Sequence, residues 1–337
     1  MKYIPRLVLG SVLLTITLFM LSPLAHAQDN YEIQVYSSEA TPKNVTMVEI
    51  HSNFTVDGSK QVINGVVPSN HAMHETLEIT QGWTDWFETG FYVFSSIQPG
   101  GSENAGWNWV GDHIRPRITA PESWHLPVGL SVAQEIGYQR RKFAEDSWSY
   151  ELRPIIDKQL GRWYFAFNPT FDRALHGLNT GKGWEFSPNV KVSFDFTKKI
   201  TGGFEYYGGL GPVSNFNPIS QQSQQIFPVI DLNLSPNWEV NFCAGVDVSN
   251  SADHLIVKCI VGRRFSWGAR RAAHTNSGVT SASPVLGELG GRAGVPGSPS
   301  ATLRSKISRQ ARPMAVREAV RTAAETAELA AIPELEA

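Results

Sequence analysis

Alternation of apolar and polar residues is the feature that most constrains how this chain can fold. In residues 189–196, NVKVSFDF, Val190, Val192, Phe194 and Phe196 share one parity, and polar residues occupy the other. Successive side chains of a β-strand point to opposite faces, so this stretch has one apolar face and one polar face. If the apolar face packs into a core, the chain is a soluble β-sandwich. If it faces lipid, the chain is a membrane barrel with a polar interior.

The same alternation recurs from about residue 45 to residue 265 and predicts about twelve strands. We place them at 45–57, 70–83, 86–97, 107–120, 127–140, 147–158, 162–173, 184–197, 200–210, 223–234, 237–249 and 254–265. Tight connections near 84–85, 160–161, 198–199 and 235–237 alternate with longer polar loops, among them 98–106, 174–183 and 211–222. Short turns at one end and long loops at the other, with an even number of strands, are typical of bacterial outer-membrane barrels.

Four further features favour lipid outside the barrel. Tryptophans gather near the predicted strand ends, as an aromatic girdle requires, and the last strand ends on an aromatic residue in HLIVKCIVGRRF. Charged residues make up 18% of the chain, against about 25% in ordinary soluble domains. After Gln28 there is no run of about 18 apolar residues that could form a membrane helix. We therefore expect an all-β fold, a transmembrane antiparallel up-and-down β-barrel in the Gram-negative outer membrane, with both ends in the periplasm.

The regions outside the barrel are distinct in composition. Residues 1–27 have a basic start, an apolar run and the site Ala25-His26-Ala27, which together predict a signal peptide. Residues 28–44 are expected to form a periplasmic segment, although YEIQVYSSEA within it could instead fold into the lumen as a plug. The barrel spans 45–267. Residues 268–337 are low in complexity and helix-like in part, and we expect them to be disordered.

Three stretches, DHIRPRI, ELRPIIDKQLGRWYFAFNPTFDRAL and EFSPNVKVS, resemble a group of bacterial outer-membrane barrels related to the family named for the MetA pathway of phenol degradation. The resemblance covers roughly residues 31–267. It implies a small barrel that acts as a transporter, with no catalytic residues, and it suggests aromatic solutes such as phenols. It includes prolines inside strands, which we interpret as bulges or bends: Pro116, Pro154, Pro169, Pro188 and Pro228.

Charged residues of the polar parity are the candidates for lining the lumen and setting its selectivity. They are Arg115, Arg117, Glu135, Arg153, Asp157, Arg162, Asp172, Lys191, Asp195, Glu205 and Asp247. Antiparallel pairing predicts that Glu135 faces Arg153 and that Asp157 faces Arg162. On this parity acids outnumber bases, so the lumen is expected to repel anions and to admit neutral or cationic solutes.

A histidine and carboxylate group on the first two predicted strands could bind zinc or copper. Its members are Glu49, His51, His74 and Glu78. Lumen histidines are usually hydrogen-bonded wall residues, however, and we expect no metal and no cofactor. Catalysis is not expected either, because no G-x-S-x-G motif is present and strand geometry sends His51 and Ser52 to opposite faces. On the same logic of parity, Cys243 and Cys259 fall on opposite faces and are expected to be free thiols.

The function predicted from the sequence is a channel or transporter for small solutes. The resemblance suggests that these solutes include aromatic or hydrophobic molecules. The alternative is a non-conducting structural or sensory barrel. Expected partners are the solute, outer-membrane lipids and lipopolysaccharide, and the barrel-assembly machinery. A net charge of −2 gives no sign of nucleic-acid binding.

Overall fold

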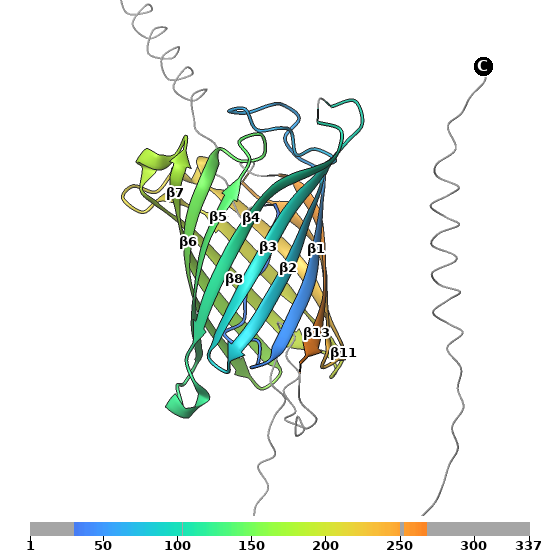
Figure 1. Cartoon of the computed structure of the whole chain (residues 1–337), viewed down its shortest axis with the longest axis vertical. Helices are drawn as coiled ribbons and strands as arrows, with labels where there is room; N and C mark the ends of the chain where they lie inside the picture. The colour runs from blue at the N-terminus through green and yellow to red at the C-terminus, as the bar shows by residue number, and fades with distance from the viewer. Residues whose placement is uncertain (1–29, 103, 250–252, 268–337) are drawn as a thin grey trace, which may run out of the picture. The chain divides into compact units, whose positions relative to one another are not determined.

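The computed structural model describes residues 30–102, 104–249 and 253–267 (Figure 1). Within them, twelve long antiparallel strands form a closed barrel, in which β13 pairs with β1 and β9 pairs with both β8 and β11. The strands are β1 (Val45–Asp57), β2 (Met73–Thr84), β3 (Phe87–Gln98), β4 (Gly106–Thr119), β5 (Gly129–Gln139), β6 (Asp146–Leu160), β7 (Trp163–Gly177), β8 (Trp184–Asp195), β9 (Ile200–Gly209), β11 (Ser223–Ser235), β12 (Trp238–Asp247) and β13 (Leu255–Ser266). The two-residue β10 (Gly211–Pro212) pairs with the start of β8.

The predicted fold class is confirmed. All twelve predicted strands exist, and their ends differ from the prediction by four residues at most. Among the described residues, no helix is long and apolar enough to cross a membrane. The predicted signal peptide (1–27) and C-terminal tail (268–337) lie outside the described residues.

The barrel wall is apolar outside and polar inside. In β8, Lys191 and Ser193 are fully buried, whereas the alternate residues Val190, Val192 and Phe194 are less buried. Large apolar side chains elsewhere on the outer face are half exposed, such as Phe242 (50%). A protein in water would bury these residues, so lipid must cover them. Exposed tryptophans lie close to strand ends, where the lipid headgroups would be. The chain is thus a transmembrane barrel of the outer-membrane type.

The connections are sorted between the two ends of the barrel, as expected. Residues 85–86, 161–162, 196–199 and 236–237 form short turns at one end, which we call the short-turn end. The connections 58–72, 99–105, 140–145, 178–183, 210–222 and 248–254 lie at the other, the long-loop end. One connection departs from this sorting: residues 120–128, which contain the short helix η1 (Glu122–Trp124), are long but lie at the short-turn end. In outer-membrane barrels the short turns face the periplasm.

The in-strand prolines are expected to mark bulges or bends. The expectation of bulges is wrong, because none of the register shifts falls at a proline. That they mark bends stays a prediction. Instead, the strand that carries a proline lacks a few residue pairs with one of its two neighbours, and the pairing then resumes in the same register. This happens between β4 and β5 at Pro116 and between β11 and β12 at Pro228. A proline lacks the N–H that a ladder needs, and the gap accommodates this without moving either strand.

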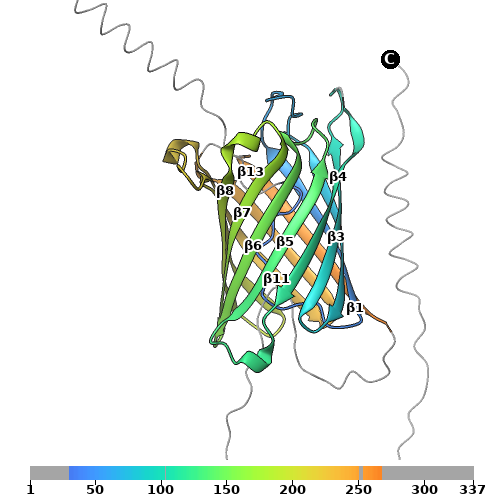
Figure 2. The ribbon, with the colours of Figure 1, turned by 60° about the vertical axis from the view of Figure 1, so that its left-hand side comes forward.

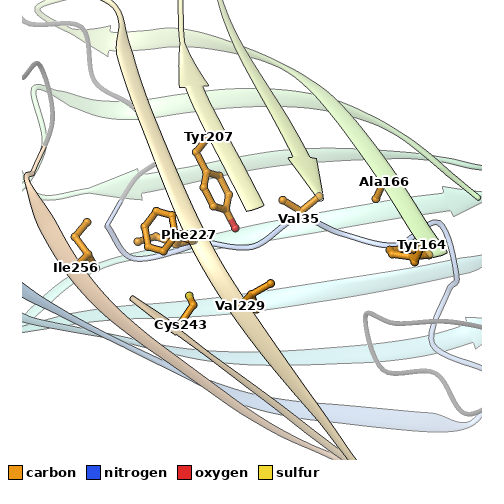
Figure 3. Close-up of a cluster of buried hydrophobic side chains, with 9 residues drawn as sticks. Val35, Tyr164, Ala166, Tyr207, Phe227, Val229, Cys243 and Ile256 are labelled. Carbon is orange, nitrogen blue, oxygen red and sulfur yellow. The ribbon is translucent and has the colours of Figure 1, made fainter. Parts of the chain in front are cut away.

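The lumen is occupied by the chain itself. Residues 30–42, which we call the lumenal segment, lie inside the barrel, and Figure 2 shows the wall closed around them in a second view. Three clusters of buried apolar side chains each join this segment to the wall. In the largest, Ile33 and Val35 contact wall residues from several strands, among them Tyr164, Tyr207 and Phe227 (Figure 3).

This position corrects the expectation that residues 28–44 form a periplasmic segment. Their described part lies in the lumen, as the plug alternative had it. Residue 30 lies at the long-loop end, so the described chain does not begin on the periplasmic side, although β1 begins and β13 ends together at the short-turn end. The thiols behave as expected: Cys243 is buried in the lumen, Cys259 is half-buried on the other parity, and both are free.

Candidate functional site in the barrel lumen

The lumenal segment runs through the barrel from one end to the other. At the long-loop end, Asn30 Nδ2 donates to Asp253 Oδ2 (2.6 Å), and Asn53 Nδ2 donates to Asn30 O (2.8 Å). At the short-turn end, the backbone N–H of Thr41 donates to Glu88, and the chain turns directly into β1. The segment therefore crosses the lumen from end to end.

Polar side chains of the wall satisfy the backbone of the segment. Asn168 accepts from Tyr36 N (2.7 Å) and donates to Tyr36 O (3.1 Å), as one strand partner would. Asp157 accepts from Ser38 N (2.9 Å) and Ser38 Oγ (2.6 Å). Arg117 donates to Ser37 O (3.0 Å). A buried backbone needs such partners, and here the wall supplies them although the segment belongs to no strand.

Tyr36 marks the point where the segment meets charged groups of the wall. Its ring lies between two guanidinium groups, 4.4 Å from Arg115 Cζ and 4.9 Å from Arg153 Cζ. Its hydroxyl donates to Glu32. The two arginines are held by wall carboxylates, Arg115 by Glu78 (2.8 Å) and Arg153 by Glu151 (2.7 Å). Cation–π contacts of this kind are stronger when they are shielded from water.

Two cavities remain on either side of this point. The outer cavity, at the long-loop end, has a volume of about 540 Å³, and Tyr31 and Glu32 lie among its lining residues. The inner cavity, at the short-turn end, has a volume of about 500 Å³ and is lined by Ser37, Ser38 and Glu39 of the same segment. Residues 33–36 line neither cavity. Residues 33–36 therefore lie between the parts of the segment that line the outer and the inner cavity.

Several predicted lumen residues form internal ion pairs. Lys191 contacts Glu205 (3.1 Å) and Asp231 (2.9 Å), and Lys258 contacts Glu205 (2.7 Å). All four side chains are at most 2% exposed. A second group joins Arg115 to Glu78 and Arg117 Nε to Glu88 (2.7 Å). These charges hold the wall and the segment in place, because each buried charge has a partner of opposite sign.

Both predicted cross-strand pairs are wrong. Glu135 is the register partner of Glu151, and Arg153 is the partner of Ala133, because the loop between β5 and β6 is centred one residue earlier than assumed. Glu135 instead contacts His113.

Asp157 and Arg162 do not meet either. Asp157 faces the lumen and holds Ser38, whereas Arg162 is exposed in the turn after β6 and donates to Asp195 O (2.7 Å). The turn places Leu160 opposite Trp163, so Arg162 belongs to the turn rather than to a strand.

The remaining predicted residues divide between cavity and rim. Asp172 lines the outer cavity and accepts from Ser187 Oγ (3.0 Å). Asp195 and Asp247 are the last residues of β8 and β12 and line neither cavity. They accept from nearby hydroxyls, Asp195 from Thr201 (2.7 Å) and Asp247 from Ser249 (2.6 Å). Their place in the structure is at the ends of the strands.

Three of the four candidate metal ligands come together. Glu49, His51 and Glu78 are buried, with one ligand atom of each within 4.8 Å of the others, and His51 Nε2 lies 3.3 Å from Glu78 Oε2. His74 is two residue pairs beyond His51 along the ladder, opposite Asn53, and packs edge-on against Tyr31. Glu78 also forms an ion pair with Arg115, so the guanidinium group of Arg115 already balances the charge of one of the two carboxylates in this group.

Sequence reasoning missed Asn168, His113 and Glu32 as site residues. Glu32 contacts Arg153 Nη1 at 3.4 Å, and the other two are described above. The sequence did contain a signal for this segment. The stretch YEIQVY, which precedes the first barrel strand, carries large, mainly apolar side chains at residues 31, 33, 35 and 36. An apolar stretch in a periplasmic linker would be exposed to water, so it needs a covering surface.

A pH effect is expected from Glu39, which lies at the inner end of the segment, outside the strands. Burial raises the pKa of Glu39 from 4.5 to about 7, and the carboxylate of Asp157 adds to the shift. The seated segment therefore binds this proton more tightly than a displaced one. Stability of the seated state falls as pH rises from about 4.5 to about 7. We expect the segment to leave its seat more readily at pH 8 than at pH 5, measured by protection of its amides from hydrogen exchange, and a weaker pH dependence in Glu39→Gln. An unchanged profile in that variant would contradict the assignment.

Comparison with known proteins gives structural likeness only. No family model matches the chain, and no curated protein does. Among solved structures, the NanC porin is 8% identical, with a TM-score of 0.44, and the match covers 65% of this chain and 98% of that one. The KdgM porin is 11% identical (TM-score 0.40; 66% and 99% covered). The outer-membrane protein Omp33 of Acinetobacter baumannii is 11% identical (TM-score 0.37; 66% and 99% covered). These neighbours are outer-membrane β-barrels, and likeness at this level carries no information on solute or activity.

Proposed function

We propose that the protein is an outer-membrane channel for small solutes, closed at rest by its lumenal segment. The observation that supports it is that a stretch belonging to no strand crosses the lumen, with one cavity on each side of its residues 33–36. The wall is held by ladder hydrogen bonds on both sides of every long strand, and none of these involves residues 30–42. The segment can therefore leave the lumen while the barrel stays intact.

The chemistry of the lumen suggests which solutes pass. The outer cavity is rich in carboxylates, which favour neutral or cationic solutes over anions. The resemblance to the barrels of the MetA pathway of phenol degradation adds aromatic solutes to this proposal. We also propose that the barrel is not an enzyme, and that its apolar outer face contacts outer-membrane lipids and lipopolysaccharide after insertion by the assembly machinery.

A second candidate is a non-conducting structural or sensory barrel. The hydrogen bonds that seat Tyr36 and Ser38 favour it, since they stabilise the closed state. The two functions differ in one measurable respect, which is whether the segment ever leaves the lumen in the intact chain.

A disulfide that pins the segment tests this. A Cβ atom placed on Gly129 of β5 lies 3.1 Å from Cβ of Ser38, close to the spacing of about 3.5–4.5 Å in a disulfide. The same Cβ overlaps Asp157 Oδ1, so the carboxylate of Asp157 must turn away for the bridge to form. We expect Ser38→Cys with Gly129→Cys, in a chain whose natural cysteines are replaced by alanine, to bridge after this movement. Solute flux into liposomes should then be lost on oxidation and restored by a reductant.

The same double variant under reducing conditions is the control, because its sequence is unchanged. Equal flux in the oxidised and reduced states, with the bridge verified by mass spectrometry, would show that solutes pass without displacement of the segment. Absence of flux in every state would favour the non-conducting barrel.

A further inference from the structure

Four carboxylates form a row across neighbouring strands on the wall of the outer cavity. Glu135 (β5) pairs in register with Glu151 (β6). Glu151 pairs with Asp172 (β7) on its other side, and Asp172 pairs in turn with Glu185 (β8). All four line the outer cavity. Like charges directly opposite each other destabilise a sheet, so the row costs stability unless cations compensate it. We call these residues the acidic row.

The chain compensates the acidic row only in part. Arg153 binds Glu151 through two nitrogens and also contacts Glu32, a fifth carboxylate on the floor of the cavity. Lys182 lies 3.7 Å from Glu185. Five carboxylates thus face two permanent cations, which leaves an excess of three negative charges when all are ionised.

Glu135 points to where a ligand would bind. The residue is only 6% exposed, and its Oε1 lies 2.5 Å from His113 Nδ1. Its Oε2 is buried, with no hydrogen-bond partner among the described residues. A buried carboxylate oxygen without a donor costs free energy, and an N–H group of a ligand in the cavity would remove that cost. This observation is independent of the charge excess.

Aromatic rings lie beside the acidic row. Phe94 packs against His113 with ring centroids 4.6 Å apart, and Tyr31 packs against Phe94 at 5.6 Å. All three residues line the outer cavity. Aromatic faces attract cations and cover apolar groups, and the volume of about 540 Å³ is that of a site for a small molecule. The cavity therefore combines an acidic wall with an apolar, aromatic one.

From these observations we propose that the outer cavity binds small organic cations with an ammonium group on an aromatic or apolar body. The ammonium group lies against Glu135, in the field of the other three carboxylates of the acidic row, and the body packs beside Tyr31 and Phe94. This deepens the proposed function by naming a solute class, and it rests on that function for the role of the binding. The binding itself is open to measurement without any flux.

Calorimetry with three related probes tests the inference. The mature chain, folded in detergent at low salt, is titrated with benzylammonium, with neutral benzyl alcohol and with benzoate. We expect benzylammonium to bind, benzyl alcohol to bind about tenfold more weakly or worse, and benzoate not to bind. Glu135→Gln and Asp172→Asn should each weaken the binding of benzylammonium by about tenfold, because each removes one charged partner of the ammonium group.

The control variant is Glu122→Gln, which makes the same charge change in the exposed η1 at the opposite end and should bind as the wild type does. Folding of each variant is checked by its heat-modifiable mobility. Equal binding of benzylammonium and benzyl alcohol overturns the inference, as does binding of Ca²⁺ without binding of benzylammonium.

Failure of this inference and failure of the proposed function give different results. If benzylammonium does not bind but the pinned variant shows redox-dependent flux, the channel stands and the solute class is wrong. If benzylammonium binds with the expected variant pattern but no form of the protein supports flux, the site stands and the channel is wrong.

Discussion

Removal of residues 30–41 is expected to convert the closed barrel into a steadily open pore. The deletion removes residues 33–36, which line neither cavity and lie between the parts of the segment that line the outer and the inner cavity. The strand ladders are untouched, so the barrel should still insert and stay heat-modifiable. Single-channel recordings in planar bilayers with asymmetric salt should show long openings with cation preference in the variant, and rare, brief openings in the intact chain.

A graded control comes from Asn168, which makes two hydrogen bonds to the backbone of Tyr36. Each is worth roughly 1 kcal/mol, so Asn168→Ala should raise the open-to-closed ratio by about tenfold or more, between the intact chain and the deletion. A deletion variant that inserts, remains folded and never conducts would overturn the channel and leave the structural or sensory barrel.

Loss of the buried ammonium group in Lys191→Met is expected to destabilise the barrel by about 3–5 kcal/mol. Lys191 is fully buried and contacts the carboxylates of Glu205 and Asp231. Without it, Glu205 keeps Lys258 as a cationic partner (2.7 Å), whereas Asp231 loses its ion pair and keeps the amide of Asn241, which donates to Asp231 Oδ1 at 2.6 Å. Urea unfolding in lipid vesicles, followed by tryptophan fluorescence, measures the free energy of unfolding.

Two comparisons separate charge balance from lost packing. Lys199→Met removes a lysine from the exposed turn after β8 and should cost little. Lys191→Met combined with Asp231→Asn removes one charge of each sign and should recover a large part of the loss. Equal destabilisation in the single and the double variant would show that the ammonium group matters for its volume rather than its charge.

The sequence determined the class of fold because the alternation of side chains is local. NVKVSFDF places Lys191 and Ser193 on one face whatever the neighbouring strand is, and the turn lengths decide which strands are neighbours. The outward face followed from the aromatic strand ends and the sorted loops. The barrel limits, the strand count and the free thiols could all be inferred in this way.

Pairs across strands were less certain, because register depends on the geometry of each connection. A shift of one residue in the centre of the β5–β6 loop moved Arg153 away from Glu135 and aligned Glu135 with Glu151. That single shift replaced an expected ion pair with the start of the acidic row. Local alternation cannot detect it, since it preserves the face of every residue.

Only the tertiary structure decided what fills the lumen. YEIQVY alternates like a barrel strand, yet it pairs with no strand and crosses the interior instead. Its position depends on partners more than a hundred residues away, such as Asn168 for Tyr36 and Asp157 for Ser38. Which surface covers an apolar segment is set by the shape that the closed wall leaves free, and that shape exists only once all twelve long strands have come together.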